Sequence, residues 1–176
     1  MIPELGHFAL IMALCLALAQ SLLPLGGYYR RRLDLMGVAA PAAVGQFVFL
    51  GLAFAALGWA FYSNDFSVAY VAANSNTDLP WYYRLAAIWG AHEGSLLLWV
   101  MVLSCWTVAV VAYSRSLPRE VAACVIAVMG LISAGFLVFM LSTSDPFVRL
   151  FPTPEQGRDL NPLLQDFGLA VHPPFL

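Results

Sequence analysis

Lysine is absent from the 176-residue sequence, and only 10% of the residues are charged. Ordinary soluble domains carry about 25% charged residues, so this scarcity excludes a water-soluble globule and a disordered tail. The formal net charge of −2 provides no basic surface, which excludes nucleic acid as a partner. The three cysteines have neither CxxC nor CxxCH spacing, which excludes a disulfide framework and a c-type cytochrome.

Apolar residues, by contrast, make up 61% of the chain. Four long apolar runs cover approximately residues 5–25, 38–62, 85–113 and 121–142. Each run is long enough to cross ~30 Å of hydrocarbon as a helix, which satisfies the backbone where there is no water. The sequence therefore predicts an all-α integral membrane protein. Residues 1–142 are expected to form a bundle of four transmembrane helices surrounded by membrane lipid.

The arginines predict the orientation of these helices. Five of the eight lie on one side of the predicted spans, at Arg30, Arg31, Arg32, Arg115 and Arg119. Positive residues in short loops stay in the cytoplasm. Glu4 stands where a cleavable signal peptide would carry positive charge, so we expect the first span to be retained. The sequence thus predicts a multi-pass protein of the bacterial inner membrane with both termini in the periplasm.

The third run contains the most distinctive helical pattern. At 100° per residue, one strip of it collects six large side chains: Trp89, His92, Leu96, Trp99, Leu103 and Trp106. This spacing predicts a heptad-like seam. A row of small residues on another side, Ala86, Gly90 and Gly94, predicts close helix–helix contact. We therefore expect a packed bundle.

The ionisable pair His92-Glu93 has three interpretations, because such pairs are costly inside a membrane. Both groups can stay wet near the outer interface, or they can orient a periplasmic loop. Alternatively, His92 ligates iron or carries protons beside tryptophans such as Trp89. His7, which has no acidic residue at helical spacing, is expected at the interface.

Residues 143–176 are predicted to form a periplasmic segment that leads into a further membrane region. Asn161-Pro162 has the pattern of a helix start. Apolar residues then recur at helical spacing up to Val171, which predicts a short amphipathic helix on the membrane surface. Because residues before proline avoid helical dihedrals, this helix ends at His172, before Pro173. His172 is thereby placed at the outer boundary, as a ligand or a surface histidine. The apolar final residues lead us to expect that the chain continues.

Several segments resemble the CcmF family of cytochrome c maturation proteins. These are residues 1–7, the Trp-Gly-Ala-His-Glu-Gly-Ser run that starts at Trp89, residues 157–166, and His172-Pro173-Pro174. The resemblance covers the whole chain but only the first quarter to third of a family member. The tryptophan-rich WWD motif of the family is absent from this chain.

The resemblance implies a haem lyase component that positions haem at the periplasmic face. Haem from CcmE would be joined, with CcmH and CcmI, to the two thiols of a CxxCH motif in apocytochrome c. Haem b would be both the substrate and a resident cofactor. The resident haem's ligands and a second periplasmic histidine are expected beyond residue 176, in the C-terminal part of CcmF. The chain alone is therefore expected to be inactive.

The resemblance also implies roles for individual residues. His172 matches a periplasmic histidine that is an axial ligand of the haem iron. Independently of the resemblance, Arg149 or Arg158 is expected to pair with a haem propionate, because both lie on the predicted periplasmic side and a guanidinium matches carboxylate geometry. Trp89 and His92 are further cofactor-binding candidates from the residues alone, since the resemblance carries no ligand role to His92. Three alternatives stay open: a membrane scaffold without haem ligation, a dedicated lyase paralogue of the NrfE type, and a small transporter that uses His92-Glu93 as a proton site.

Overall fold

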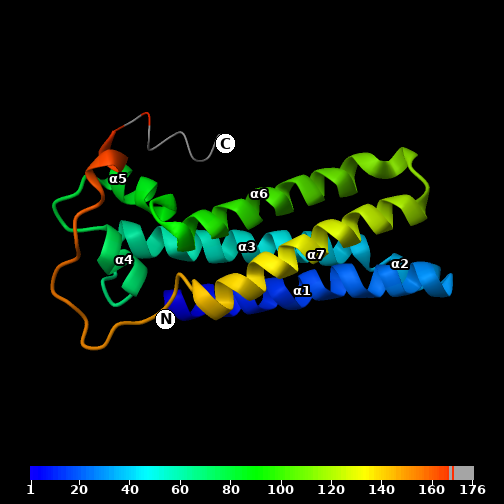
Figure 1. The fold of residues 1–176 in the computed structure, drawn as a ribbon, viewed down its shortest axis with the longest axis horizontal. Coiled ribbons are helices and arrows are strands. Elements are labelled where there is room, and N and C mark those ends of the chain that lie inside the picture. The colour runs from blue at the N-terminus through cyan, green and yellow to red at the C-terminus, as the bar shows by residue number, and fades with distance from the viewer. Residues whose placement is uncertain (167, 169–176) are drawn as a thin grey trace.

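Four long helices form an antiparallel bundle in the computed structural model, which describes residues 1–166 and 168 (Figure 1). They are α1 (Ile2–Arg30), α3 (Ala39–Tyr62), α6 (His92–Tyr113) and α7 (Arg119–Thr143). Each is long and apolar enough to cross a membrane. No strand occurs among the described residues. The predicted all-α, multi-pass membrane fold is confirmed.

Short helical elements connect the long ones. Helix α2 (Leu33–Met36) precedes α3, and η2 (Ser114–Ser116) joins α6 to α7. Between α3 and α6 lie three elements: α4 (Ala69–Asn74), α5 (Trp81–Ala86) and η1 (Ala87–Trp89). Of the predicted amphipathic helix, the structure describes a 3-10 turn, η3 (Pro162–Gln165). The remainder of that helix and His172 fall largely outside the described residues.

Small residues allow α1 to be the central helix, packed against both α3 and α7. Ala9, Ala13 and Ala17 are buried along its length. Helix α6 completes the bundle by packing on α3 and α7. Small side chains let helix backbones approach closely in lipid, where no hydrophobic force drives their association. The expectation of a packed bundle is thus met mainly by alanines of α1.

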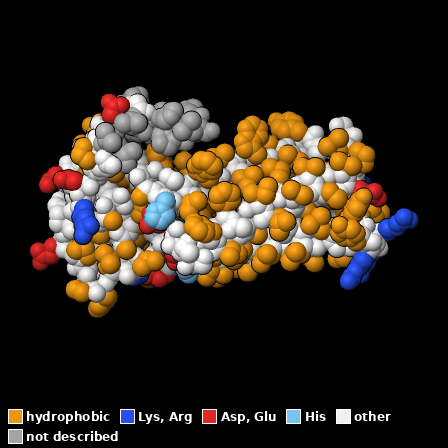
Figure 2. Space-filling model, viewed as in Figure 1, with side chains coloured by type: hydrophobic (Ala, Val, Ile, Leu, Met, Phe, Trp, Pro, Cys, Tyr) orange, Lys and Arg blue, Asp and Glu red, His pale blue; other side chains and the backbone are white. Residues whose placement is uncertain are grey.

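The two ends of the bundle differ in character. One end carries residues 63–91 and 144–166, which together we call the cap, and the N-terminus lies beside it (Figure 1). The opposite end carries α2 and the α6–α7 turn. Figure 2 shows a belt of hydrophobic side chains between two charged ends: acidic, histidine and basic side chains at the cap end, and mainly arginines at the other end. The polar groups thus lie at the two ends of an apolar body, as a membrane protein requires.

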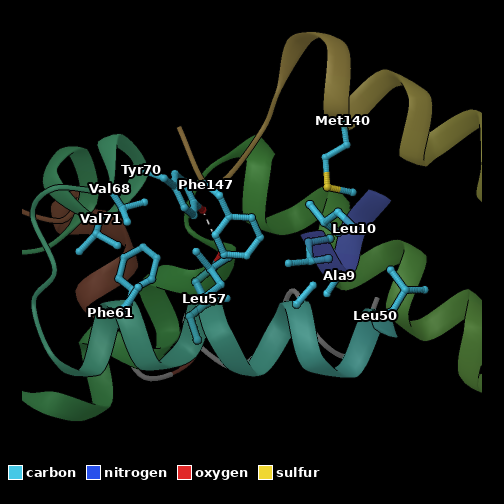
Figure 3. Close-up of a cluster of buried hydrophobic side chains, with 14 of the residues drawn as sticks. Ala9, Leu10, Leu50, Leu57, Phe61, Val68, Tyr70, Val71, Met140 and Phe147 are labelled. Carbon is cyan, nitrogen blue, oxygen red and sulfur yellow. Dashed lines mark hydrogen bonds between the residues drawn. The ribbon is translucent and has the colours of Figure 1, made fainter. Parts of the chain in front are cut away.

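The hydrophobic core runs without interruption from the bundle into the cap (Figure 3). Leu10, Leu50 and Met140 belong to its bundle part. Where the two parts meet, the ring of Phe61 on α3 packs edge to face on the ring of Tyr70 in the cap, with centroids 5.3 Å apart. Phe147 fills the space beside Gly6, where an added Cβ would overlap its ring. The cap is therefore fixed to the membrane helices by burial.

The third span is shorter than the expected 85–113. Helix α6 begins at His92, because Ala91 is extended with φ −138° and ψ 179° and separates it from η1. Trp89 is consequently not on α6, and the row Ala86, Gly90, Gly94 is divided between elements. The long apolar run continues beyond the polar pair His92-Glu93, so hydropathy alone does not reveal where the helix begins.

The tryptophan seam of α6 faces outwards, contrary to the expected packing role. Trp99 is 60% exposed and Trp106 is 66% exposed. The buried face carries Leu97, Val100, Ser104 and Thr107. Both hydroxyls donate to carbonyls of their own helix, Ser104 to Met101 at 2.7 Å and Thr107 to Leu103 at 2.8 Å. Small side chains whose hydroxyls are hydrogen-bonded within α6 thus form its contact with the bundle. They permit closer helix packing than tryptophan side chains do.

Gln46 on α3 provides a test of the bundle interior. It is fully buried, and neither amide atom has a hydrogen-bond partner among the described residues. Because a buried unpaired polar group costs about 1–3 kcal/mol, we expect Gln46→Leu to raise the free energy of unfolding by that amount. Gln20→Leu is the control and should gain less, since Gln20 Nε2 donates to the Ile126 carbonyl at 2.8 Å. Thermal unfolding in detergent measures both, and a loss of stability in Gln46→Leu would contradict the expectation.

Candidate functional site

Backbone pairing joins the two segments of the cap. The Ala69 N–H donates to the Val148 carbonyl, and the Leu150 N–H donates to the Ser67 carbonyl, both at 2.8 Å. These bonds flank an antiparallel bridge between Val68 and Arg149. Further along, the Arg158 N–H donates to the Ala72 carbonyl at 2.8 Å. The chain leading to residue 166 is thus held against the loop that follows α3.

Asn76 strengthens this connection. Its Oδ1 accepts from the N–H groups of Asp78 and Leu79 at 3.0 and 2.8 Å, and its Nδ2 donates to Asp159. Beside it, Gln156 Nε2 donates to Thr77 Oγ1 at 2.6 Å. The sequence analysis did not identify Asn76. The Asn-x-Asp pattern at residues 76–78 is the available signal, because asparagine commonly accepts from the backbone two residues on.

Arg149 ties the cap to the start of α1. Its Nη2 lies 2.9 Å from Glu4 Oε1, and its Nη1 lies 3.3 Å from Asp65 Oδ2. Nη1 also donates to Ser67 Oγ. The structure thus gives this guanidinium two carboxylate partners within the chain, so a haem propionate would have to compete with both.

Arg158 is differently placed. Its side chain is exposed and makes no ion pair with any other described residue. It lines a pocket of about 440 Å³ together with Ala72, Pro152, Pro154 and Gln156. With its backbone fixed and its guanidinium unpaired, Arg158 is the more available of the two predicted arginines for an anionic group.

Tyr70 holds the break that precedes α6. Its buried hydroxyl donates to the Ile88 carbonyl at 2.9 Å and accepts from the Ala91 N–H at 3.2 Å. Burial raises the pKa of Tyr70 above its usual range, so it is a neutral donor at physiological pH. Gly94 is required beside it, because a Cβ there would overlap the Ile88 carbonyl oxygen. Neither role was predicted, since both depend on contacts between distant segments.

Tyr70→Phe is expected to reduce the free energy of unfolding by about 1–3 kcal/mol, because the Ala91 N–H would lose its buried acceptor. Tyr82→Phe is the matched control, since Tyr82 is 52% exposed and should tolerate the change. Thermal unfolding monitored by size-exclusion chromatography measures both variants. Equal midpoints for Tyr70→Phe and the parent would refute this role.

His92 and Glu93 lie at the junction between cap and bundle. The His92 side chain is 67% exposed, and its Nδ1 lies 3.3 Å from Glu93 Oε2. Both line a pocket of about 520 Å³ with Asn74 and Asp145. Glu93 stands in the first turn of α6, where a carboxylate opposes the helix dipole favourably. The exposed His92 fits the interpretation of a wet interfacial group, whereas Glu93 Oε2 is buried beside it.

His7 has a partner that helical spacing could not reveal. Its Nδ1 lies 2.8 Å from Asp145 Oδ2, which comes from the segment after α7. The pair joins α1 to the cap beside the junction pocket, which Asp145 lines. His7 is thus engaged within the chain.

The structure places two of the predicted site residues, His92 and Arg158, beside α4. The pockets of His92 and Arg158 share Ala69 and Ala73 of this helix. Trp89 packs partly buried against the core, and its carbonyl accepts from Ser95 Oγ at 2.9 Å. His172 lies outside the described residues. Within residues 1–166 and 168, no group of three or more metal-ligating side chains occurs.

Comparisons with known proteins agree on one family. The family described as cytochrome C assembly protein matches residues 89–176, half of the chain. CcmF of Pseudomonas aeruginosa, a cytochrome c-type biogenesis protein, is 64% identical over 177 residues, covering 100% of this chain and 27% of that protein. NrfE of Haemophilus influenzae, also a cytochrome c-type biogenesis protein, is 43% identical over 176 residues, covering 100% and 28%.

A solved structure shares the fold. The cytochrome c haem lyase CcmF superposes with a TM-score of 0.76 at 29% identity, over 84% of this chain and 25% of that chain. The chain therefore spans about a quarter of the length of the relatives it matches.

Proposed function

Because the chain belongs to the cytochrome c assembly protein family, as its resemblance predicted, we propose that it forms the membrane-anchored cap that positions haem for attachment to apocytochrome c. The single observation that carries this proposal is the fixed course of residues 147–159 across the cap. That course carries the described chain to residue 166 at the cap end of the bundle, opposite α2 and the α6–α7 turn (Figure 1).

The proposed orientation places the cap in the periplasm. Arg30, Arg31, Arg32 and Arg119 all lie at the other end of the bundle, where the positive-inside rule expects the cytoplasm of an inner-membrane protein. Both the N-terminus and residue 166 would then be periplasmic. Haem-loaded CcmE, CcmH, CcmI and apocytochrome c would meet the cap from that side, with the remaining part of CcmF beside the bundle.

Within this proposal the chain binds and orients its substrate. His172 would hold the haem iron as a neutral imidazole, and Arg158 would pair with a propionate, since a guanidinium matches carboxylate geometry. Arg149 would instead fix the cap, because Glu4 and Asp65 already pair with it. Each cysteine thiol adds across one vinyl double bond, sulfur to one carbon and hydrogen to the other. Orientation is what the protein contributes.

A resident haem b needs ligands beyond the described residues. His7 is paired with Asp145, and His92 is the only histidine among the described residues that line its pocket. These two histidines therefore do not fit a site with two axial imidazoles, and we assign no resident haem to the described residues.

His172→Ala tests the proposal in the complete assembly. We expect the variant to bind about tenfold less haem from haem-loaded CcmE than the parent does, because an iron ligand is lost. Visible absorption of the purified complex measures the haem. His92→Ala is the control and should keep the parental spectrum. Unchanged haem in His172→Ala, in a complex of parental size, would overturn the ligand role.

Two alternatives remain, and the same experiment tests the first of them. The membrane scaffold is favoured by one observation, that Arg149, His7 and Asn76 are all engaged in internal contacts. If it is correct, neither histidine variant changes the haem content. The higher identity to CcmF than to NrfE supports the CcmF-type role over the dedicated paralogue.

A further inference from the structure

An apolar pocket opens at the arginine end of the bundle, far from the cap. Its volume is about 440 Å³, within the ~300–1,000 Å³ range of ligand sites. Met36 of α2, Ala40 of α3 and Val111 of α6 line it, together with Ala122 and Ile126 of α7. Four helices thus contribute to one cavity whose lining is mostly apolar, with Ser114 and Arg119 as its polar members.

The depth of this pocket corresponds to the outer part of a lipid leaflet. Arg119 lines the pocket at the start of α7, where the membrane span begins. Ile126 lies seven residues further on, about 10 Å along the helix axis at 1.5 Å per residue. The pocket therefore runs from a charged boundary into the hydrocarbon, as a phospholipid does from its phosphate to its acyl chains.

The positive charge at this end of the bundle favours a lipid with an anionic headgroup. The sequence places five arginines here against two carboxylates, Asp34 and Glu120. Asp34 is already paired with Arg32, whose Nη2 lies 2.5 Å from its Oδ2. Arg119 makes no ion pair with any of the residues the structure describes. An anionic headgroup would therefore meet an unpaired guanidinium at the mouth of an apolar cavity.

We propose that this pocket binds one anionic phospholipid, with its phosphate on Arg119 and an acyl chain between α2, α6 and α7. Basic pockets between membrane helices are suited to such headgroups. The lipid would fill the space between α2 and the α6–α7 turn and hold these elements together. The site is distinct from the cap and does not depend on the function proposed for it.

The test is native mass spectrometry of the protein in mild detergent with equimolar dioleoyl phosphatidylglycerol and dioleoyl phosphatidylcholine. We expect about fivefold preference for phosphatidylglycerol at the first site, the contribution of one basic residue near an anionic surface. Arg119→Gln should abolish this preference. Ala122→Phe should reduce binding of both lipids by filling the pocket.

Two controls make the proposal refutable. Arg30→Gln removes an equal charge from the same end but does not touch the pocket, so it should keep the preference. If Arg30→Gln and Arg119→Gln act equally, the effect is diffuse surface charge and the site is wrong. An excess of inorganic phosphate should not displace the lipid. Displacement would identify a phosphate site instead, and unchanged binding in Ala122→Phe would refute the acyl-chain pocket.

Discussion

Replacing Gly94 by alanine is expected to lower the free energy of unfolding by more than about 4 kcal/mol, because backbone would have to move to admit one methyl group. The added Cβ would overlap the Ile88 carbonyl oxygen and lie 2.7 Å from the Tyr70 hydroxyl. Those two atoms are hydrogen-bonded to one another at 2.9 Å. The substitution therefore separates η1 from the first turn of α6.

Gly135→Ala on α7 is the matched control for this prediction. Nothing lies within 4 Å of a Cβ added at Gly135. Alanine favours helix over glycine by about 1 kcal/mol, so this variant should be at least as stable as the parent. Thermal unfolding measured in detergent compares the two. A Gly94→Ala protein with the parental midpoint would show that the junction is not closed as the structure has it.

Gly157→Ala is expected to detach the second cap segment, with a loss of about 3 kcal/mol or more. Its Cβ would overlap the Ser75 carbonyl oxygen and lie 2.8 Å from Phe66 Cε1. The adjacent Arg158 N–H would then lose its bond to the Ala72 carbonyl. Because residues 156–159 hold the chain that leads to residue 166, the displaced segment should be cleaved faster by protease.

Thr153→Ala controls for the loop itself, since Thr153 is exposed in the same segment. We expect its proteolysis rate and thermal midpoint to match the parent. If the proposed function holds, the yield of cytochrome c maturation by the complete assembly should fall in Gly157→Ala but not in Thr153→Ala. Parental proteolysis and parental yield in Gly157→Ala would contradict the role given to this segment.

The sequence predicts the four spans and the family because both depend on local patterns. Apolar runs of about 20 residues identify membrane helices irrespective of their contacts. The run that starts at Trp89 and the segment 157–166 carry the resemblance. Arginine positions likewise distinguish the two ends of the bundle without any tertiary information.

The contacts that build the cap could not be predicted in this way. The start of α6 at His92 depends on a hydroxyl from Tyr70, which belongs to another helix. The partner of His7 is Asp145, which follows α7 and is distant from His7 in the sequence. Periodicity placed Trp99 and Trp106 on one strip but did not determine which strip of α6 meets the bundle. Such choices are made by packing between segments.

The hydrophobic core shared by cap and bundle determines how the protein unfolds. Phe147 and Tyr70 of the cap belong to the same buried cluster as Leu10 and Met140 of the bundle. Groups that lose their burial together melt together. The cap is therefore not a lid that swings open while its anchor stays intact. Access to its surface must come from the approach of a partner, and damage to either half removes both.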